Sequence, residues 1–299
     1  MGSKILLLGS NGQLGSFAKH FLPYIGETIC LNYPDIDFTK PNEVTSMINA
    51  IAPDVVFNSV AYTNVDKAEE EYDLCKIVNT TTPGEIAKLS SSLDFLFVHF
   101  STDFVFSGKN RNTPYTELDT PDPINKYGSS KLKSEEIIQQ NAEKFFILRT
   151  SWLYSKRKTS FVGKVMNWAR KMKTLRIVED QVGSPTSAFD LSNVTMQAIK
   201  TALDHGDDWI RRNAGVYHLG GVGTASRFEW AKKILELDPN RDTQIVEEIL
   251  PARSSDFHTT ANRPEFSPLD CSKFKQTFGV SLPAWESSLN FLMSKIHEH

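Results

Sequence analysis

Three tyrosines in this sequence are each followed four residues later by a lysine, a pattern that suits proton transfer to a carbonyl group. Carbonyl reduction by hydride needs a phenol that protonates the developing alkoxide and a nearby cation that lowers the phenol's pKa. Residues i and i+4 of a helix lie on one face, so both side chains can contact one ligand. The pairs are Tyr72 with Lys76, Tyr127 with Lys131, and Tyr154 with Lys158.

The expected topology favours the second pair. In an open α/β sheet, ligands bind beyond the carboxyl ends of the strands. Tyr127 begins an expected helix over residues 126–140, which follows the fourth strand and a proline-rich loop. Tyr72 lies within the preceding helix among acidic residues, and Tyr154 lies in an expected loop, YSKRK, where helical spacing does not apply. We therefore predict Tyr127 as the proton donor and Lys131 as its cation.

Hydroxyl and carboxyl groups end the fourth strand in the segment HFSTDFVFSG, which contains Ser101, Thr102 and Asp103. A substrate carbonyl would arrive there beside Tyr127, so all three residues are candidates for substrate contact. The alternative is that these residues only terminate the strand, with the aspartate capping the turn that follows.

A glycine-rich turn, GSNGQLG, lies directly between the first apolar run and the first helical segment, with Gly9, Gly12 and Gly15 at the glycine positions. This is the context of a dinucleotide-binding turn, in which the backbone N–H groups and the helix dipole face a pyrophosphate. A Cβ atom at these positions would obstruct the approach. The alternative is an ordinary strand-to-helix turn.

The second strand predicts how the adenosine half of such a cofactor is held. The acid that commonly binds the adenine ribose is replaced by Asn32, so the sequence leaves open whether NADH or NADPH is used. Asp37 and Phe38 follow, and could bind adenine by hydrogen bonding and stacking. Asp37 could instead cap the helix that begins near Pro41.

Apolar runs alternate with helical patterns through the first half of the chain. Strand–helix–strand repeats of this kind predict an α/β fold with a doubly wound parallel sheet, the Rossmann architecture. The expected strands are 4–9, 27–32, 54–59, 94–100 and 144–150, and the expected helices are 13–21, 41–52, 66–91 and 126–140.

Beyond residue 150 the pattern changes to shorter elements with more Pro, Gly and Ser. We expect a dinucleotide-binding domain over 1–150 and a smaller substrate-binding lobe over 151–299, with some of its segments returning to the first domain. Ser226 and Glu229 have capping-box spacing and predict a helix start. We interpret His297 and His299 as part of a solvent-exposed tail.

Composition restricts the partners. The 299 residues carry a formal net charge of −3 with no basic stripe or acidic tail, so we expect neither a nucleic-acid nor a membrane partner. Three separated cysteines outside any CxxC spacing argue against a disulfide framework or zinc site, and favour a reducing, cytoplasmic location. A small-molecule ligand is the default expectation.

Seven sequence blocks resemble the dTDP-4-dehydrorhamnose reductase family of the extended short-chain dehydrogenase/reductase superfamily, in the family's order and nearly from end to end. They are GSNGQLG, AYTNVDKAE, STDFVFSG, PINKYGSSK, RTSWLY, DQVGSPTS and NRPEFSPLD. The resemblance implies reduction of the 4-keto group of dTDP-4-dehydro-L-rhamnose by NADPH or NADH in a monomer or homodimer. Some relatives use Mg²⁺, which leaves a metal requirement open, although no metal-ligating residues are predicted.

The resemblance also implies residue roles. Thr102, Tyr127 and Lys131 would form the catalytic triad, with Lys131 also orienting the nicotinamide ribose. Substrate contacts would come from Thr102, Asp103, Phe104 and Trp152. Cofactor contacts would come from Gly9, Asn11, Gly12, Gln13, Leu14, Gly15, Asp37, Phe38, Ala61, Tyr62, Thr63, Tyr127 and Lys131.

Two positions depart from the family pattern: Phe104 replaces the tyrosine that usually follows STD, and Asn32 replaces the usual acid. The first affects a hydrogen bond and the second affects cofactor choice. Arg263 in the NRP block is a candidate contact for the substrate diphosphate, because a guanidinium binds such groups bidentately. A structural salt bridge is the alternative for Arg263.

Other functions remain compatible with the same sequence blocks. A nucleotide-sugar epimerase or dehydratase of the superfamily would share the glycine-rich turn and the Tyr–Lys pair. The regulatory subunit of eukaryotic methionine adenosyltransferase also resembles this family, so a non-catalytic dinucleotide-binding subunit is a further alternative. The intact set of Thr102, Tyr127 and Lys131 favours the reductase.

Overall fold

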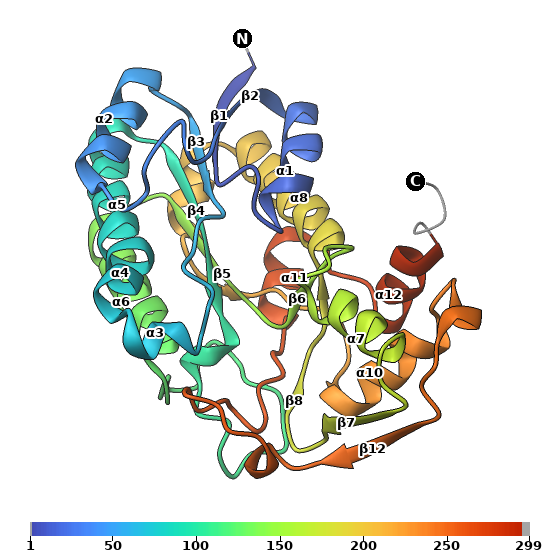
Figure 1. Ribbon diagram of the computed structural model, residues 1–299. Coiled ribbons are helices and arrows are strands. Elements are labelled where there is room, and N and C mark those ends of the chain that lie inside the picture. The colour runs from blue at the N-terminus through green and yellow to red at the C-terminus, as the bar shows by residue number, and fades with distance from the viewer. Residues whose placement is uncertain (1, 295–299) are drawn as a thin grey trace.

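A parallel six-stranded sheet forms the centre of the computed structural model, which describes residues 2–294 (Figure 1). The strand order is β10-β5-β4-β3-β1-β2, and every pairing in this sheet is parallel. The five strands predicted before residue 150 are confirmed, and the sixth comes from the second half of the chain. The strands are β1 (Ser3–Leu8), β2 (Gly26–Leu31), β3 (Val55–Asn58), β4 (Leu96–Thr102), β5 (Phe145–Thr150) and β10 (Gly215–His218).

Helices cover both faces of this sheet, because successive strand residues point to opposite sides. Val98 and Leu148 point to one face, and Phe97 and Ile147 point to the other. The first face is covered by α1 (Gly15–Phe21), α8 (Ala188–His205), α9 (Asp207–Arg212) and α11 (Ser272–Phe278). The second is covered by α2 (Pro41–Ile51), α5 (Thr82–Leu93) and α6 (Lys126–Asn141). The predicted doubly wound α/β class is confirmed.

A second apolar core lies beside the sheet, where Tyr154 and Trp230 are fully buried. The predicted capping box is confirmed, since Ser226 and Glu229 bond each other's backbone N–H groups at the start of α10. Its helices are α7 (Phe161–Ala169), α10 (Arg227–Glu236) and α12 (Trp285–Ser294). Its short strands are β6 (Leu153–Tyr154), β7 (Thr174–Val178), β8 (Val182–Gly183), β9 (Thr186–Ser187), β11 (Ala225–Ser226) and β12 (Glu248–Ala252).

Two local predictions were wrong. Residues 66–91 do not form one helix: α3 (Lys67–Glu70), α4 (Tyr72–Lys76) and a π-helical turn (Ile77–Thr81) precede α5. The turn allows Asn79 to point inward, where its side chain bonds the backbone of Tyr62. Tyr154 lies in strand β6 and not in a loop, because its ring packs against Trp230 in the second core.

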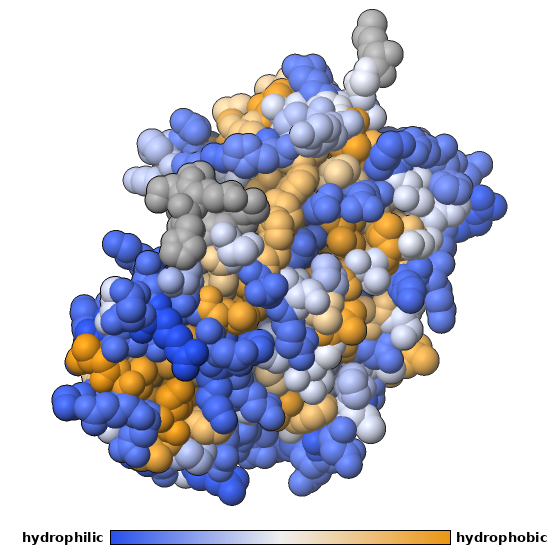
Figure 2. Space-filling view, turned by 90° about the vertical axis from the view of Figure 1, so that its right-hand side faces the viewer, coloured by the Kyte–Doolittle hydropathy of each residue, from blue (hydrophilic) through white to orange (hydrophobic). Residues whose placement is uncertain are grey.

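The division of the chain at residue 150 stays a prediction. Segments from beyond that point contribute to both cores. Strand β10 joins the sheet and helices α8 and α11 pack on it, whereas α7, α10 and α12 form the second core. The expected tail containing His297 and His299 lies outside the described residues. On the right-hand side of the view in Figure 1, polar side chains predominate and apolar ones gather in separate patches (Figure 2). Within residues 2–294, no helix combines the length and apolar character needed to cross a membrane.

Close packing of α6 against the segment after β4 gives a testable prediction. A Cβ atom at Gly128 would lie 2.1 Å from the backbone oxygen of Phe104, so Gly128→Ala must push α6 away from β4. We expect the free energy of unfolding to fall by about 2 kcal/mol or more in urea titrations. Gly84→Ala is the matched control, because its Cβ would meet only the side chain of Ile137, at 3.0 Å. Equal losses in both variants would contradict this reading of the α6 contact.

Candidate active site

The predicted site residues lie together because they follow the carboxyl ends of neighbouring parallel strands. The order β2-β1-β3 places the switch point of the sheet between β1 and β3, where ligands bind in this class of fold. The glycine-rich turn follows β1, Asn32 to Phe38 follow β2, Ala61 to Thr63 follow β3, Asp103 and Phe104 follow β4, and Trp152 follows β5.

The glycine-rich turn has the geometry that its glycines were predicted to permit. Gly9 adopts a φ of +83°, a conformation that L side chains rarely take. A Cβ atom at Gly15 would lie 2.2 Å from the backbone oxygen of Gly9, so the turn and the start of α1 are in direct contact. This close approach leaves a cradle of backbone at the helix start, which fits a dinucleotide pyrophosphate.

Side chains from beyond residue 150 hold this turn. Gln13 donates from Nε2 to the carbonyl of Leu153 at 2.9 Å and accepts from the Ser155 hydroxyl at 3.1 Å. The Arg157 guanidinium donates to the carbonyls of Asn11 and Gly12. The Leu14 side chain is buried in the apolar core between the sheet and α1. No motif in the sequence signalled the part that Arg157 has in this arrangement.

The residues after β2 form a compact turn. Asn32 donates to the carbonyl of Tyr33 at 2.6 Å, and its oxygen faces the backbone N–H of Asn11 at 3.4 Å. Asp37 accepts from the backbone and hydroxyl of Thr39, and these hydrogen bonds lower the pKa of its carboxyl. Asp37 does not cap α2, whose N-cap residue is Lys40. Phe38 packs at the edge of the apolar core with part of its surface exposed.

The segment after β3 is fixed through Tyr62. Asn79 accepts from the backbone N–H of Tyr62 at 2.8 Å and also donates to the hydroxyl of Ser130 on α6 at 3.1 Å. The Tyr62 phenol donates to Glu71 at 2.6 Å, and this bond raises the pKa of Tyr62 to about 12. Ala61 is partly buried and Thr63 is exposed beside it. The π-helical turn therefore positions this segment relative to α6.

Tyr127 lies at the start of α6, facing the end of β4. Burial raises the pKa of its phenol, and hydrogen bonding with the Thr102 hydroxyl offsets part of that rise. The Phe104 ring meets the Tyr127 ring edge-on, with 5.9 Å between centroids. The sequence predicted that the Lys131 ammonium lowers the pKa of Tyr127. The structure does not show this lowering, because the Lys131 amine contacts His99.

Thr102 and Asp103 are buried beside Tyr127, at 6% and 2% exposure. The Asp103 carboxyl accepts hydrogen bonds from the hydroxyls of Thr102, Ser151 and Ser267. Burial nevertheless raises its pKa to about 6. Asp103 thus joins three chain segments at the site.

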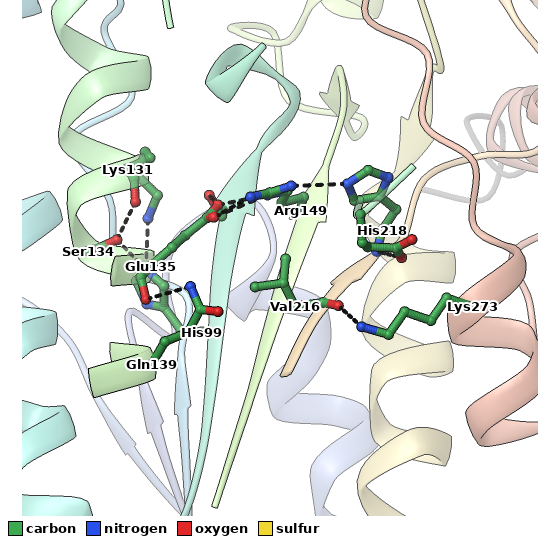
Figure 3. Close-up of polar contacts among 11 residues, drawn as sticks. His99, Lys131, Ser134, Glu135, Gln139, Arg149, Val216, His218 and Lys273 are labelled. Carbon is green, nitrogen blue, oxygen red and sulfur yellow. Dashed lines mark hydrogen bonds and ion pairs between the residues drawn. The ribbon is translucent and has the colours of Figure 1, made fainter. Parts of the chain in front are cut away.

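Ser101 does not face the site, contrary to expectation. Alternation along β4 turns it toward α6, where its hydroxyl donates to the Glu135 carboxylate at 2.5 Å. Glu135 is in turn held by a bidentate bond from the Arg149 guanidinium (Figure 3). This buried ion pair joins α6 to β5.

Lys131 is 1% exposed and its amine lies 3.0 Å from Nε2 of His99 on β4. Burial lowers the pKa of Lys131 to about 8, against the opposing effect of the Glu135 carboxylate. His99 is a site residue that the sequence reasoning missed. The available signal was an isolated histidine in the apolar run LFVHF, two residues before Ser101 and therefore on the same face of the strand.

Trp152 is partly buried, and one face of its ring is covered by the Arg227 guanidinium at 3.5 Å from the ring centroid. Its ring also stacks on Trp230. The resemblance implies that Trp152 contacts the substrate, and contact at the covered face of its ring would have to include Arg227. Arg227 is the first residue of α10, and its charge interacts with that of Asp103. Sequence reasoning missed it because it belongs to no motif.

Arg263 forms the salt bridge that the sequence left as the alternative. Its guanidinium contacts the Asp66 carboxylate at 2.5 Å and donates to the carbonyl of Ala261. This bridge ties the NRP segment to the start of α3. For a metal, residues 2–294 contain no group of three or more His, Cys, Asp or Glu side chains placed to bind one.

Comparison with known proteins places this geometry in a family. The family model described as "RmlD substrate binding domain" matches residues 3–297. The dTDP-4-dehydrorhamnose reductase of Salmonella typhimurium is 34% identical over 98% of this chain and 97% of its own length.

The chain belongs to the dTDP-4-dehydrorhamnose reductase family. The resemblance predicted from sequence blocks is confirmed. The solved reductase of Bacillus anthracis, in complex with NADP, has a TM-score of 0.87 and 31% identity, covering 99% of this chain and 100% of its own. The UDP-glucose 4-epimerase of Thermotoga maritima, at 19% identity and a TM-score of 0.79, shares the fold.

The buried charge on Lys131 gives a prediction for stability. Below pH 8 the amine is protonated in the folded and unfolded chain, and folding removes that charge from water. We expect Lys131→Met to raise the free energy of unfolding at pH 7 by on the order of 3 kcal/mol. Between pH 8 and the ordinary lysine value of 10.5 the wild-type protein should recover this difference, because its folded state has already lost the proton. A difference that stays constant from pH 7 to pH 10 in urea titrations would contradict the assignment.

Proposed function

We propose that this chain reduces the 4-keto group of dTDP-4-dehydro-L-rhamnose to dTDP-L-rhamnose, with NADPH or NADH as the reductant. The proposal is carried by one observation: the Tyr127 ring at the start of α6 packs against Phe104, directly after Thr102 and Asp103 at the end of β4, in a chain of this reductase family. A bound nicotinamide would supply the hydride. The Gly9 to Gly15 turn, at which Cβ atoms would meet neighbouring atoms of the protein and so prevent the tight turn into α1, supports dinucleotide binding.

In this mechanism Tyr127 gives its proton to the alkoxide oxygen. The Thr102 hydroxyl, which donates to Asp103 in the structure, would turn its proton to the substrate and hold the carbonyl oxygen in line with the phenol. Since burial favours the neutral phenol, Tyr127 stays protonated until negative charge develops on the substrate oxygen. Lys131, one turn further along α6, would bind the nicotinamide ribose and stabilise the phenolate that remains.

Substrate contacts are proposed for the other end of the site. Asp103 and Phe104 line the wall next to Tyr127, and Trp152 with Arg227 would face the nucleotide-linked part. Arg227 is a candidate for the diphosphate, because no carboxylate among the described residues lies within ion-pair distance of it. A diphosphate contact from Arg263 would require its bridge to Asp66 to open.

Location and assembly are also proposals. The three described cysteines are free, which supports a reducing compartment and hence the cytoplasm. A monomer or homodimer and the absence of nucleic-acid partners stay predictions.

The decisive assay incubates the protein with dTDP-4-dehydro-L-rhamnose and NADPH and follows loss of the reduced-nicotinamide absorbance. We expect Tyr127→Phe to lower kcat by at least ~10²-fold, because the proton donor is lost, while the Kd for NADPH changes less than ~3-fold. The controls are Tyr72→Phe and Tyr154→Phe, taken from the other two Tyr–Lys pairs, and both should retain turnover. Full activity in Tyr127→Phe would exclude this tyrosine. An epimerase would convert nucleotide sugars without net consumption of NADPH.

Cofactor choice gives a separate prediction. The neutral amide of Asn32 at the end of β2 does not repel the additional phosphate of NADPH. We expect Asn32→Asp to weaken NADPH binding by about 10-fold and NADH binding by much less, through charge repulsion. Fluorescence titration of both cofactors measures this, with Asn32→Ser as the uncharged control. Equal weakening of both cofactors would place Asn32 away from the ribose.

A further inference from the structure

His99 is buried in β4, the strand that ends at Thr102, and the mechanism above gives it no part. It is 1% exposed and lies on β4 opposite Asn58 of β3. Three polar groups surround its ring: the Asn58 amide 3.1 Å from Nδ1, and the Lys131 amine and Ser134 hydroxyl at 3.0 Å and 3.3 Å from Nε2. Burial lowers the pKa of His99 well below its ordinary value, so the ring is neutral and carries one N–H proton.

The Asn58 amide determines where that proton lies. The backbone N–H of Val60 donates to Oδ1 of Asn58 at 3.1 Å, which fixes the amide oxygen on that side. The amide nitrogen therefore points at Nδ1 of His99 and can only donate to it. Nδ1 is the acceptor, and the proton must be on Nε2.

Ser134 gives the same answer independently. Its hydroxyl donates its single proton to the backbone carbonyl of Lys131 at 2.7 Å. The oxygen can then only accept from His99, which again requires the proton on Nε2 (Figure 3). Two unrelated hydrogen bonds thus select one tautomer.

Lys131 consequently faces a donor. A protonated amine has three N–H groups and no acceptor, so it gains no hydrogen bond from the Nε2–H of His99, whereas a neutral amine can accept that proton. We propose that His99 is a positioning residue for Lys131: its Nε2–H, fixed by Asn58 and Ser134, faces the amine and weakens the hold of Lys131 on its proton. The tautomer of His99 follows from its hydrogen bonds alone, whereas its effect on catalysis rests on the proposed function.

Other ionisable groups around Lys131 act in the opposite direction or are compensated. Glu135 on the same helix favours the charged amine, and its carboxylate is paired with Arg149. The Cys75 thiol on α4 is held neutral, since burial raises its pKa, and Tyr127 is held neutral in the same way. His99 reaches the Lys131 amine from β4 and presents an N–H group to it. This contact therefore distinguishes Lys131 from a lysine that faces a hydrogen-bond acceptor.

Cofactor binding and turnover should fall as pH rises through the titration of Lys131, because only the ammonium stabilises the phenolate and binds the ribose strongly. In His99→Gln, the carboxamide can rotate and present its oxygen to Lys131. We expect the alkaline fall in kcat/KM and in NADPH affinity to move up by at least about one pH unit, a tenfold change in the proton dissociation constant.

The first test needs neither substrate nor cofactor. A long-range ¹H–¹⁵N NMR spectrum of the histidine rings at neutral pH should show the Nε2–H form for His99, with His99→Gln providing the assignment. His218 is an internal reference of opposite type, because its Nδ1 faces the carbonyl of Tyr115 at 2.9 Å and must carry the proton. An Nδ1–H form or an imidazolium at His99 would overturn the proposal, even if the chain proves not to reduce the sugar.

The second test is the pH dependence of NADPH dissociation and of kcat/KM in wild type, His99→Gln and His218→Gln. The last variant removes an equally buried histidine that does not contact Lys131. An upward shift only in His99→Gln supports the proposal. No shift, a downward shift, or the same shift in both variants would overturn it. If the sugar is not reduced while the pH dependence of NADPH dissociation shifts as expected, the proposed function fails and the role of His99 stands.

Discussion

The attachment of helix α6 to strands β4 and β5 is the constraint on which the rest of the site depends. Gly128 allows the helix to touch the Phe104 backbone, and Glu135 joins it to Arg149 and Ser101. A buried ion pair of this kind adds little net stability, because removing both charges from water offsets their attraction. Its contribution is orientation: Tyr127 and Lys131 are held on one side of α6, at the edge where the strands end.

Burial sets the electrostatics of the site. The pKa of Lys131 falls and those of Tyr127 and Asp103 rise, since burial disfavours the charged form of each. Such a site costs folding free energy. It brings the pKa values of Lys131 and Asp103 nearer to neutral pH and keeps the Tyr127 phenol protonated. The chain offsets part of this cost with hydroxyl and amide partners, of which the three hydroxyls around Asp103 are the clearest example.

Family membership and the detailed contacts carry different information. Membership follows from matches along nearly the whole chain, and it supports the substrate class and the cofactor. The contacts show how this chain arranges the residues: Arg227 covers the Trp152 ring, Arg263 is paired with Asp66, and Arg157 holds the glycine-rich turn. Each of these cations comes from a segment distant in sequence from its partner.

The sequence by itself determined the local features: the apolar strands, the glycine-rich turn, the capping box at Ser226 and the fold class, because each depends on residues close together in the chain. It also selected Tyr127 over Tyr154, since strand order predicts which helix start lies at the ligand edge. Only the tertiary structure decided that Ser101 turns away, that His99 faces Lys131, and that the pKa of Tyr127 is raised in the protein alone. The first two depend on partners more than thirty residues away and the third depends on desolvation. No local pattern records which side chains meet once the core is packed.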